Sequence, residues 1–242
     1  MRISWSLGAW LPVMRHQPEG HGVVALSYDD GPNPDSTPGI LDALDAHGAK
    51  ATFFLLGCRA APHPDLIANI VARGHQALPH GWDHIRHDRV PTAEMIDSME
   101  RTEALLRRYR ATPDPFIVRL PYNGGHRNAR VHRALRRWQA NARFAHWGAS
   151  CEDHTIPTRC QGPEDVDRLC REAVATVFAT RRMEGAILLL HDQPIGMDSP
   201  FAAAAAIRLT QLLLEEMSRR GLRGVPITPL ARQSLLSRFV FA

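Results

Sequence analysis

The sequence predicts an α/β fold, a distorted barrel of parallel strands with helices packed outside it, built as a single domain. Short apolar segments alternate with segments whose apolar residues recur at helical spacing, which is typical of parallel strands joined by helices. The length of 242 residues suits one barrel and is too short for two full catalytic domains. With 44% hydrophobic and 22% charged residues, the composition excludes disordered, collagen-like and purely coiled-coil proteins.

The first half of the chain opens with a strand. Residues 23–28 are apolar and end in Asp-Asp-Gly-Pro, which predicts a strand followed by a turn. Residues 36–47 have apolar side chains in helical register, and Gly48 follows as a stop signal. The further elements of this half are a strand over 51–56, a helix over 65–73, a short strand ending at residue 78, and a helix over 92–110 with Thr92 as its N-cap.

The second half continues the alternation. It comprises a strand over 116–120, a helix over 128–140, a strand over 144–147, a helix over 164–181, a strand over 186–190, a helix over 201–220 and a strand over 225–227. About seven strands and six helices fit a closed or nearly closed barrel, and an open doubly wound sheet is the other arrangement that this pattern allows. In both, functional residues gather at the carboxyl ends of the strands.

Charge and cysteine content argue against two classes of site. The formal net charge of +4 would suit an anionic partner, but the arginines are spread along the chain and no nucleic-acid-binding motif is present. We therefore expect no nucleic acid partner. The four cysteines form no C-x-x-C pair, which argues against a cysteine zinc site.

The ends of the chain favour a cytoplasmic location. Trp5, Ser6, Gly8 and Trp10 interrupt the apolar N-terminal stretch and no A-x-A site follows, so it makes a poor signal peptide. No segment approaches 18 uninterrupted apolar residues, so we expect no membrane span. Isolated cysteines also suit a reducing compartment.

Reactive side chains follow the predicted strands one after another. They are Asp29 with Asp30, His80 with His84, Arg119 with Tyr122, then Asp153, and His191 with Asp192. Because the carboxyl ends of parallel strands meet at one end of a barrel, we expect these side chains to share a site.

His80 and His84 have the spacing of a metal-binding pair. On a helical turn, residues four apart face the same way, so both imidazoles could share a cation. The spacing alone is a weak signal, since 13 histidines in 242 residues give roughly 0.7 such pairs by chance. Asp29 or Asp30 would complete a site of two histidines and one carboxylate, with positions left for water and substrate.

Five short segments occur in the order of motifs of a known family. They are Leu26-Ser-Tyr-Asp-Asp-Gly-Pro-Asn-Pro with Ala51-Thr-Phe-Phe-Leu-Leu-Gly, Arg73-Gly-His-Gln-Ala-Leu-Pro-His-Gly-Trp-Asp-His, Arg119-Leu-Pro-Tyr, the stretch from Trp147 to Asp153, and Ile187-Leu-Leu-Leu-His-Asp. Together they resemble the NodB-type polysaccharide deacetylases, carbohydrate esterase family 4. The resemblance implies a distorted (β/α)7-type barrel. It predicts a catalytic domain over residues 22–230, between an N-terminal extension over 1–21 and a C-terminal tail over 231–242.

The resemblance also implies a role for each reactive residue. Asp30, His80 and His84 would bind a divalent metal, usually Zn²⁺, with Co²⁺, Ni²⁺ or Mn²⁺ as other candidates. Asp29 would be the general base and His191 the general acid. Arg119 would pair with Asp29, Asp153 would hydrogen-bond His191, and the backbone N–H of Tyr122 would help to bind the oxyanion.

Removal of an N-acyl group requires such a set. The metal would polarise the amide carbonyl and its bound water, while the base takes a proton from that water. The acid would then protonate the departing amine, which is otherwise a poor leaving group. The predicted function is therefore removal of an N-acyl group, most simply acetyl, from an amino sugar or oligosaccharide.

Several positions depart from the family pattern and leave other substrates open. Tyr28 stands where Phe is usual, Asn123 where Gly is usual, Ser150 where Asp is common, and His154 where Trp is usual. These changes concern the substrate wall, as does the polar loop from Gln193 to Pro200. Deacylation, deformylation or non-hydrolytic tailoring of a small metabolite stays an alternative, and a non-catalytic binding module is a further one. The sequence does not indicate an oligomeric state.

Overall fold

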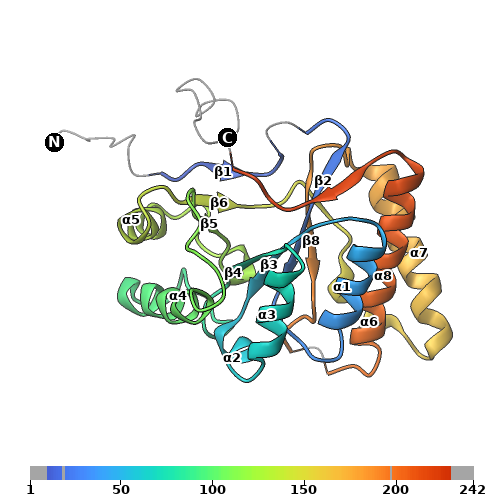
Figure 1. Cartoon of the computed structure of the whole chain (residues 1–242), viewed down its shortest axis with the longest axis horizontal. Helices are drawn as coiled ribbons and strands as arrows, with labels where there is room; N and C mark the ends of the chain where they lie inside the picture. The colour runs from blue at the N-terminus through green and yellow to red at the C-terminus, as the bar shows by residue number, and fades with distance from the viewer. Residues whose placement is uncertain (1–9, 18–19, 197, 230–242) are drawn as a thin grey trace.

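Parallel strands with helices outside them build the protein, as the alternation predicts (Figure 1). The computed structural model describes residues 10–17, 20–196 and 198–229. One sheet has the order β4-β3-β2-β8-β7, with β9 paired to the start of β2, and the other has the order β1-β6-β5. The strands are β1 (Val13–Met14), β2 (Val23–Asp29), β3 (Thr52–Leu55), β4 (Gln76–Pro79), β5 (Ile117–Val118), β6 (Arg143–Ala145), β7 (Ala149–Ser150), β8 (Ile187–His191) and β9 (Arg223–Val225). Every pair between these strands is parallel, and together they form the predicted distorted barrel in a single domain.

Helices cover the outside of the barrel. The longer ones are α1 (Thr37–Ala46), α3 (Pro64–Ala72), α4 (Thr92–Leu106), α5 (Ala129–Trp138), α7 (Pro163–Thr180) and α8 (Ala202–Arg219). Short helical segments lie at strand ends: α2 (Gly57–Ala60), α6 (Ile156–Arg159), and the 3₁₀ turns η1 (Pro121–Asn123) and η2 (Asp153–Thr155). In Figure 1, α1, α7 and α8 lie together on one side of the molecule, and α4 and α5 on the other. Among the described residues, no helix combines the length and apolar character needed to cross a membrane.

Several predicted elements differ from the structure. The predicted strand 144–147 overlaps β6 and ends earlier, because the chain crosses at 146–148 to the other sheet, where β7 follows. The predicted strand 225–227 begins two residues earlier, as β9, because Arg223 and Gly224 pair with the start of β2. Thr92 is the first residue of α4 and not its N-cap, which is Pro91, because the ψ of 146° at Pro91 is extended and the helix begins only after it. The same helix ends at Leu106, and the side chain of Arg110 returns to the buried carboxylate of Glu103 at 2.6 Å.

The chain ends of the described region meet beside the barrel. Val13 and Met14, which precede the predicted catalytic domain, form β1 and pair with Phe144 and Ala145. The side-chain amide of Gln17 donates through Nε2 to the carbonyl of Pro226 at 2.7 Å. Its Oε1 accepts from the backbone N–H of Thr228 at 3.1 Å. The remaining residues of the predicted extension and tail, 1–9, 18–19 and 231–242, lie outside the described residues.

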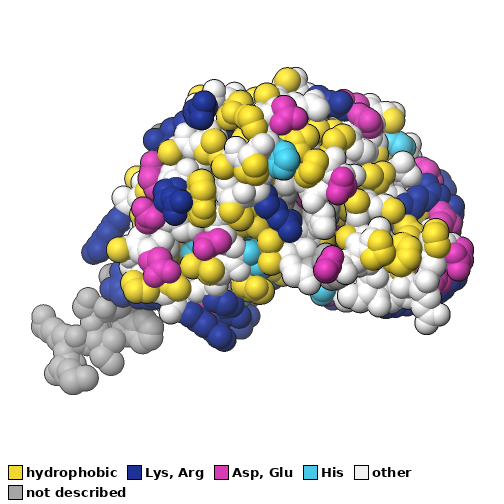
Figure 2. All heavy atoms as spheres, turned by 90° about the horizontal axis from the view of Figure 1, so that it is seen from below, with side chains coloured by type: hydrophobic (Ala, Val, Ile, Leu, Met, Phe, Trp, Pro, Cys, Tyr) yellow, Lys and Arg dark blue, Asp and Glu magenta, His cyan; other side chains and the backbone are white. Residues whose placement is uncertain are grey.

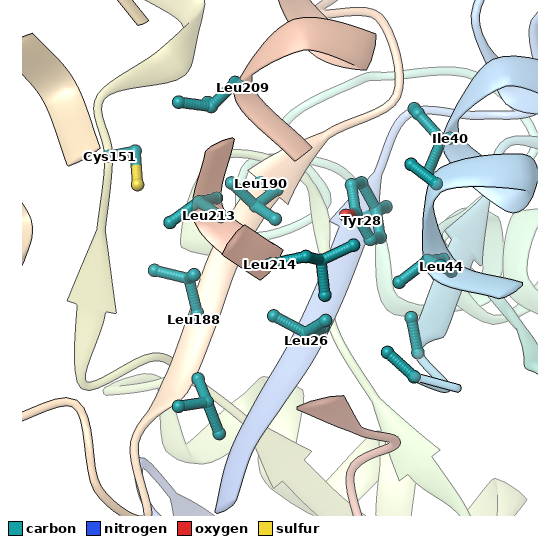
Figure 3. Close-up of a cluster of buried hydrophobic side chains, with 14 of the residues drawn as sticks. Leu26, Tyr28, Ile40, Leu44, Cys151, Leu188, Leu190, Leu209, Leu213 and Leu214 are labelled. Atoms are coloured by element: carbon teal, nitrogen blue, oxygen red, sulfur yellow. The ribbon is translucent and has the colours of Figure 1, made fainter. Parts of the chain in front are cut away.

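All residues of β2 are buried, and each face of this strand packs into a different part of the core. Leu26 and Tyr28 face outward and pack with residues of β8, α1 and α8, including Leu188, Ile40 and Leu213 (Figure 3). Side chains alternate along a strand, so Ala25, Ser27 and Asp29 face the inside of the barrel. The same strand therefore packs against the core with one face and places its last residue, Asp29, inside the barrel with the other.

Strand register brings the reactive residues to one end of the barrel. The pairing of β2 with β8 sets Asp29 beside His191, and β4 ends one residue before His80. Figure 2 shows the molecule from the side toward which β8 runs in Figure 1, and histidine side chains reach the surface there among hydrophobic ones. Arginine and lysine side chains on this face lie in several separate places with acidic side chains between them.

Candidate active site

Two adjacent aspartates lie at the end of β2, and their side chains point in different directions. Asp29 completes the strand and points into the barrel, and Asp30 has a left-handed backbone with φ of 71°. A non-glycine residue in that region is strained and persists where its surroundings hold it. Asp30 is held by Arg59, whose guanidinium donates to its carbonyl at 2.9 Å, and by the N–H of Ile195, which donates to Oδ2 at 3.2 Å.

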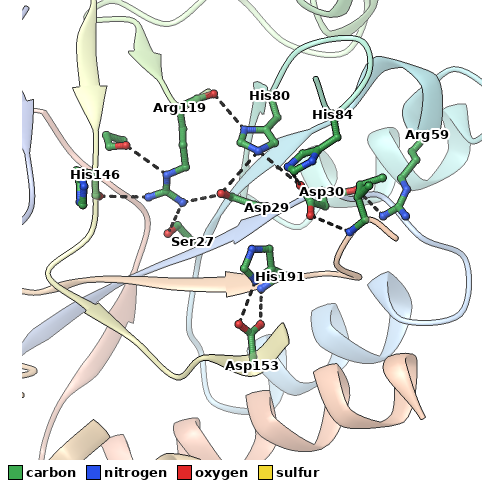
Figure 4. A network of polar contacts seen from close by, with 12 residues as sticks. Ser27, Asp29, Asp30, Arg59, His80, His84, Arg119, His146, Asp153 and His191 are labelled. Carbon is green, nitrogen blue, oxygen red and sulfur yellow. Dashed lines mark hydrogen bonds and ion pairs between the residues drawn. The ribbon is translucent and has the colours of Figure 1, made fainter. Parts of the chain in front are cut away.

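Three potential ligand atoms converge at Asp30, as Figure 4 shows. Its Oδ1 lies 3.5 Å from Nε2 of His80 and 3.3 Å from Nε2 of His84, and has no hydrogen-bond partner among the described residues. The Nδ1 of His80 donates to the carbonyl of Arg119 at 3.1 Å, so its Nε2 presents a lone pair. We call Asp30, His80 and His84 the cation cage.

The cation cage fits a divalent metal in charge and spacing. Burial lowers the pKa of His80 to about 3 and that of His84 to about 4, so both rings are neutral near pH 7 and can act as ligands. Bonds of about 2.0–2.1 Å in a tetrahedral Zn²⁺ site place neighbouring ligand atoms about 3.4 Å apart. The observed 3.3 and 3.5 Å agree with that spacing. Two nitrogens and one carboxylate leave coordination positions open for water and substrate.

The histidine pair does not lie on a helical turn, contrary to the sequence prediction. Residues 80–84 form a loop after β4, and Gly81 has a φ of +94°. A side chain at Gly81 would clash with the ring of His87, so glycine is required both by the backbone and by this close approach. The two imidazoles converge because this turn brings His84 back toward the strand end.

Asp29 forms a buried ion pair with Arg119. Nη1 of Arg119 donates to Oδ1 of Asp29 at 2.8 Å and to Oγ of Ser27 at 2.9 Å, and the guanidinium is fully buried. Burial by itself would raise the pKa of Asp29, but Arg119, together with His80 and His191, holds that pKa below its usual range. The other oxygen of Asp29, Oδ2, lies 3.8 Å from Nε2 of His80 and therefore faces the cation cage.

His191 has the opposite charge preference. Its Nδ1 lies 3.0 Å from Oδ1 of Asp153, whose Oδ2 accepts from the backbone N–H of His191 at 2.6 Å. Burial by itself would lower the pKa of His191, but Asp153, with Asp30 and Asp29, raises it to about 9. The site therefore places an ionised carboxylate and a protonated imidazole on adjacent strands.

Tyr122 and Asn123 continue the wall of the site beyond β5. Both have left-handed backbones, with φ of 56° and 52°, and the ring of Tyr122 lies 4.3 Å from that of His84, centroid to centroid. The side-chain amide of Asn123 lies 2.6 Å from Nε2 of His146. The atom of Asn123 in this contact is Nδ2, and its amide oxygen has no hydrogen-bond partner among the described residues. Nδ1 of His146 lies 3.0 Å from Arg15 and from the carbonyl of Trp147.

The site also contains residues to which the sequence assigned no role. Asp192 is fully buried, accepts from the hydroxyls of Ser36 and Thr37, and donates its N–H to the carbonyl of Asp29 at 3.0 Å. Arg59 donates to the carbonyl of Gln193 at 2.6 Å as well as to that of Asp30. Asp192 was recognisable only by its place after His191, and Arg59 had no sequence signal.

The polar loop that follows β8 lies against the cation cage, as its sequence position suggested. Its contacts with Asp30 and Arg59 run through Ile195 and Gln193, and Ser199 donates to the carbonyl of Pro157 at 3.1 Å. Met197 lies outside the described residues. The described part of the loop therefore packs against one side of the cage.

The fold and the site together define an α/β-barrel protein with a cation cage at the carboxyl ends of its strands. The chain belongs to the polysaccharide deacetylase family, whose pattern matches residues 16–142, and this confirms the resemblance found in the motifs.

Relatives and solved structures extend this comparison. A chitooligosaccharide deacetylase of Bradyrhizobium sp. (strain ANU 289) is 32% identical over 212 residues, which are 86% of this chain and 90% of that protein. The chitin deacetylase of the fungal pathogen Colletotrichum lindemuthianum has a TM-score of 0.72 at 25% identity over 89% of each chain. A CE4 family pseudoenzyme from Bacillus anthracis has a TM-score of 0.69 at 18% identity, over 91% of this chain and 69% of its own. The fold therefore occurs with and without activity, and the side chains of the site must decide between them.

Proposed function

We propose that the protein is a metal-dependent hydrolase that removes an N-acyl group, most simply acetyl, from an amino sugar or oligosaccharide. The observation that carries the proposal is the cation cage lying beside two groups of opposite protonation. Asp29 is held ionised by Arg119, and His191 is held protonated by Asp153. A pair of groups whose surroundings push their pKa values apart is typical of an acid and a base in one site.

Asp30, His80 and His84 would hold the metal, with Zn²⁺ as the first candidate and Co²⁺, Ni²⁺ or Mn²⁺ as others. When bound, such an ion acts as a Lewis acid on the acyl carbonyl and lowers the pKa of water. The orphaned Oδ1 of Asp30 and the two neutral imidazoles support this assignment.

Asp29 is the base of this proposal. Its Oδ2 faces the cage and is free to take a proton from the attacking water, while Arg119 fixes Oδ1. A fully buried guanidinium with several hydrogen-bond partners cannot move away, so it orients the carboxylate and keeps it ionised.

His191 is the acid. The parallel register sets it beside Asp29 on the adjacent strand, so base and acid lie next to one another at the same barrel end. Asp153 orients the ring through Nδ1, which leaves Nε2–H to protonate the departing amine. The backbone N–H of Tyr122, on the turn that packs over His84, would donate to the oxyanion.

The named relatives support an N-acetylated sugar as substrate. The test is acetate release from short N-acetylglucosamine oligomers by protein loaded with Zn²⁺ or Co²⁺, with the metal-free protein as control. An N-acetylated monosaccharide and an N-formylated analogue in parallel reactions separate an oligosaccharide substrate from the small-metabolite alternative. The absence of acyl release from every N-acyl sugar by the metal-loaded protein would overturn the proposal.

Asp29→Asn separates catalysis from mere binding. We expect this variant to lose about 10²–10⁴-fold in turnover, the usual contribution of a general base. It should retain bound metal, since Asp29 is not part of the cation cage. Equal turnover in the variant and the parent would contradict the role of Asp29 as base. A protein that binds sugar but shows no turnover in either form would be a binding module.

A further inference from the structure

A second group of metal-ligand side chains lies on the other side of the general acid. Asp153, His154 and His191 each offer one ligand atom, and these atoms all lie within 4.8 Å of one another. We propose that these three residues bind a second divalent cation, such as Zn²⁺ or Co²⁺, and that this cation inhibits the enzyme. Binding to the three residues stands on the geometry alone, and the inhibition rests on the proposed function.

The geometry of the group suits a cation. Nδ1 of His191 and Oδ1 of Asp153 are 3.0 Å apart, close to the spacing of about 3.4 Å expected for two ligands of one tetrahedral ion. Asp153 and His154 are consecutive in the turn η2, and the rings of His154 and His191 lie 6.0 Å apart, centroid to centroid, edge to face. A ring nitrogen of His154 therefore lies within 4.8 Å of the ligand atoms of Asp153 and His191.

The group is partly open to solvent and has carboxylates beside its imidazoles. The side chain of His154 is 47% exposed and that of His191 17%, so a hydrated cation can reach both rings. Nε2 of His154 lies 3.9 Å from Oε2 of Glu152, which adds a second carboxylate beside the one from Asp153. Imidazole nitrogens and carboxylate oxygens are both ligand types that bind Zn²⁺.

Occupation of this group would disable the acid. The cation takes the lone pair of Nδ1 of His191, the Nδ1 proton leaves to solvent, and no group is oxidised or reduced. The ring then loses the hydrogen bond that orients it on Asp153 and the positive charge that makes it a proton donor.

Titration of the metal-free protein with Co²⁺ tests the binding independently of activity. We expect the parent to take up two equivalents in two phases. The visible absorption of Co²⁺ and equilibrium dialysis measure this uptake. His154→Phe should show only the first phase, and Asp30→Asn only the second. His21→Phe, which removes a histidine whose side chain is 96% exposed, should keep both phases.

The inhibition is measured as the ratio of the rate at ten equivalents of Zn²⁺ to the rate at one equivalent. In the parent and in His21→Phe, the rate at ten equivalents should be at least tenfold lower than the rate at one equivalent. In His154→Phe the two rates should be nearly equal. A second equivalent bound equally well by His154→Phe and the parent, or no second equivalent in the parent, would overturn the proposal. Two phases without any acyl release would instead refute the proposed function and leave the second site standing.

Discussion

Asp29 and Asp30 are neighbours in the chain, yet their surroundings give them opposite properties. Arg119 keeps the pKa of Asp29 below its usual range, and burial raises that of Asp30 to about 6. Either aspartate could be the metal ligand by its place in the sequence. The direction in which each side chain turns, set by the left-handed backbone of Asp30, assigns Asp30 to the cation cage and leaves Asp29 beside it.

Replacement of Arg119 tests the buried ion pair. Arg119→Met should destabilise the fold by about 3–5 kcal/mol, because the variant leaves the carboxylate of Asp29 buried without its partner. The loss should appear as a lower midpoint of denaturant unfolding. Arg171→Met is the matched control: Arg171 pairs with Asp167 at the surface, where removal of an ion pair costs at most about 1 kcal/mol. Equal losses in the two variants would refute a special role for the buried pair.

Asn123 is expected to position the turn that carries Tyr122. Asn123→Gly retains the left-handed backbone without strain but loses the contact with His146. We expect kcat to fall about 5–10-fold, the value of one hydrogen bond of roughly 1 kcal/mol, with little change in KM. Asn123→Ala should lose the same factor and also stability, since alanine is strained at a φ of 52°. A wild-type kcat in Asn123→Gly would show that only the backbone conformation matters.

At the scale of elements, β3 and β4 are joined at their start by a buried histidine. Nδ1 of His75, just before β4, accepts from the N–H of Ala51 at 3.1 Å, and burial lowers the pKa of His75 to about 4. The unfolded chain binds a proton near pH 6.5, and the folded protein does so only near pH 4. The contribution of His75 to stability is therefore complete above pH 6.5 and is lost as the pH falls toward 4.

This loss amounts to about 3 kcal/mol for His75. His75→Asn keeps an acceptor for Ala51 and does not titrate, so the free energy of unfolding of the metal-free protein should depend less on pH between 6.5 and 4. His47→Asn, at an exposed position after α1, should leave the dependence as it is in the parent. An unchanged slope in His75→Asn would contradict the assignment.

The elements also show where local pattern fails. The long helices were predictable because their apolar residues keep the helical period over many residues, and β2 because a continuous apolar run ends in a turn signal. β1 and β7 have two residues each, too few to display any period, and they exist because neighbouring strands pair with them. β5 also has only two residues, within the strand predicted over 116–120. The loop that carries His80 and His84 has helical spacing without helical structure, because Gly81 turns the chain.

At the scale of the whole molecule, the cation cage joins β2 to the loop after β4. A cation bound there should stabilise the folded state by about 2.7 kcal/mol at a free concentration of 100 times its Kd. For a chain of this size that corresponds to roughly 5–10 °C in Tm. Thermal unfolding with Zn²⁺ and with a chelator measures the difference. Asp30→Asn should abolish most of it, and an equal shift in this variant would place the stabilising ion elsewhere.

The sequence alone determined the fold class, the family and the set of reactive residues. Periodicity reveals strands and helices, and five ordered motifs mark residues whose types suit metal and proton-transfer chemistry. Tertiary structure alone decided which atoms meet: the turn of Asp30 toward two neutral imidazoles, the burial of Arg119 against Asp29, and the place of His154 beside His191. These depend on backbone angles, strand register and burial, which arise from contacts between residues far apart in the chain.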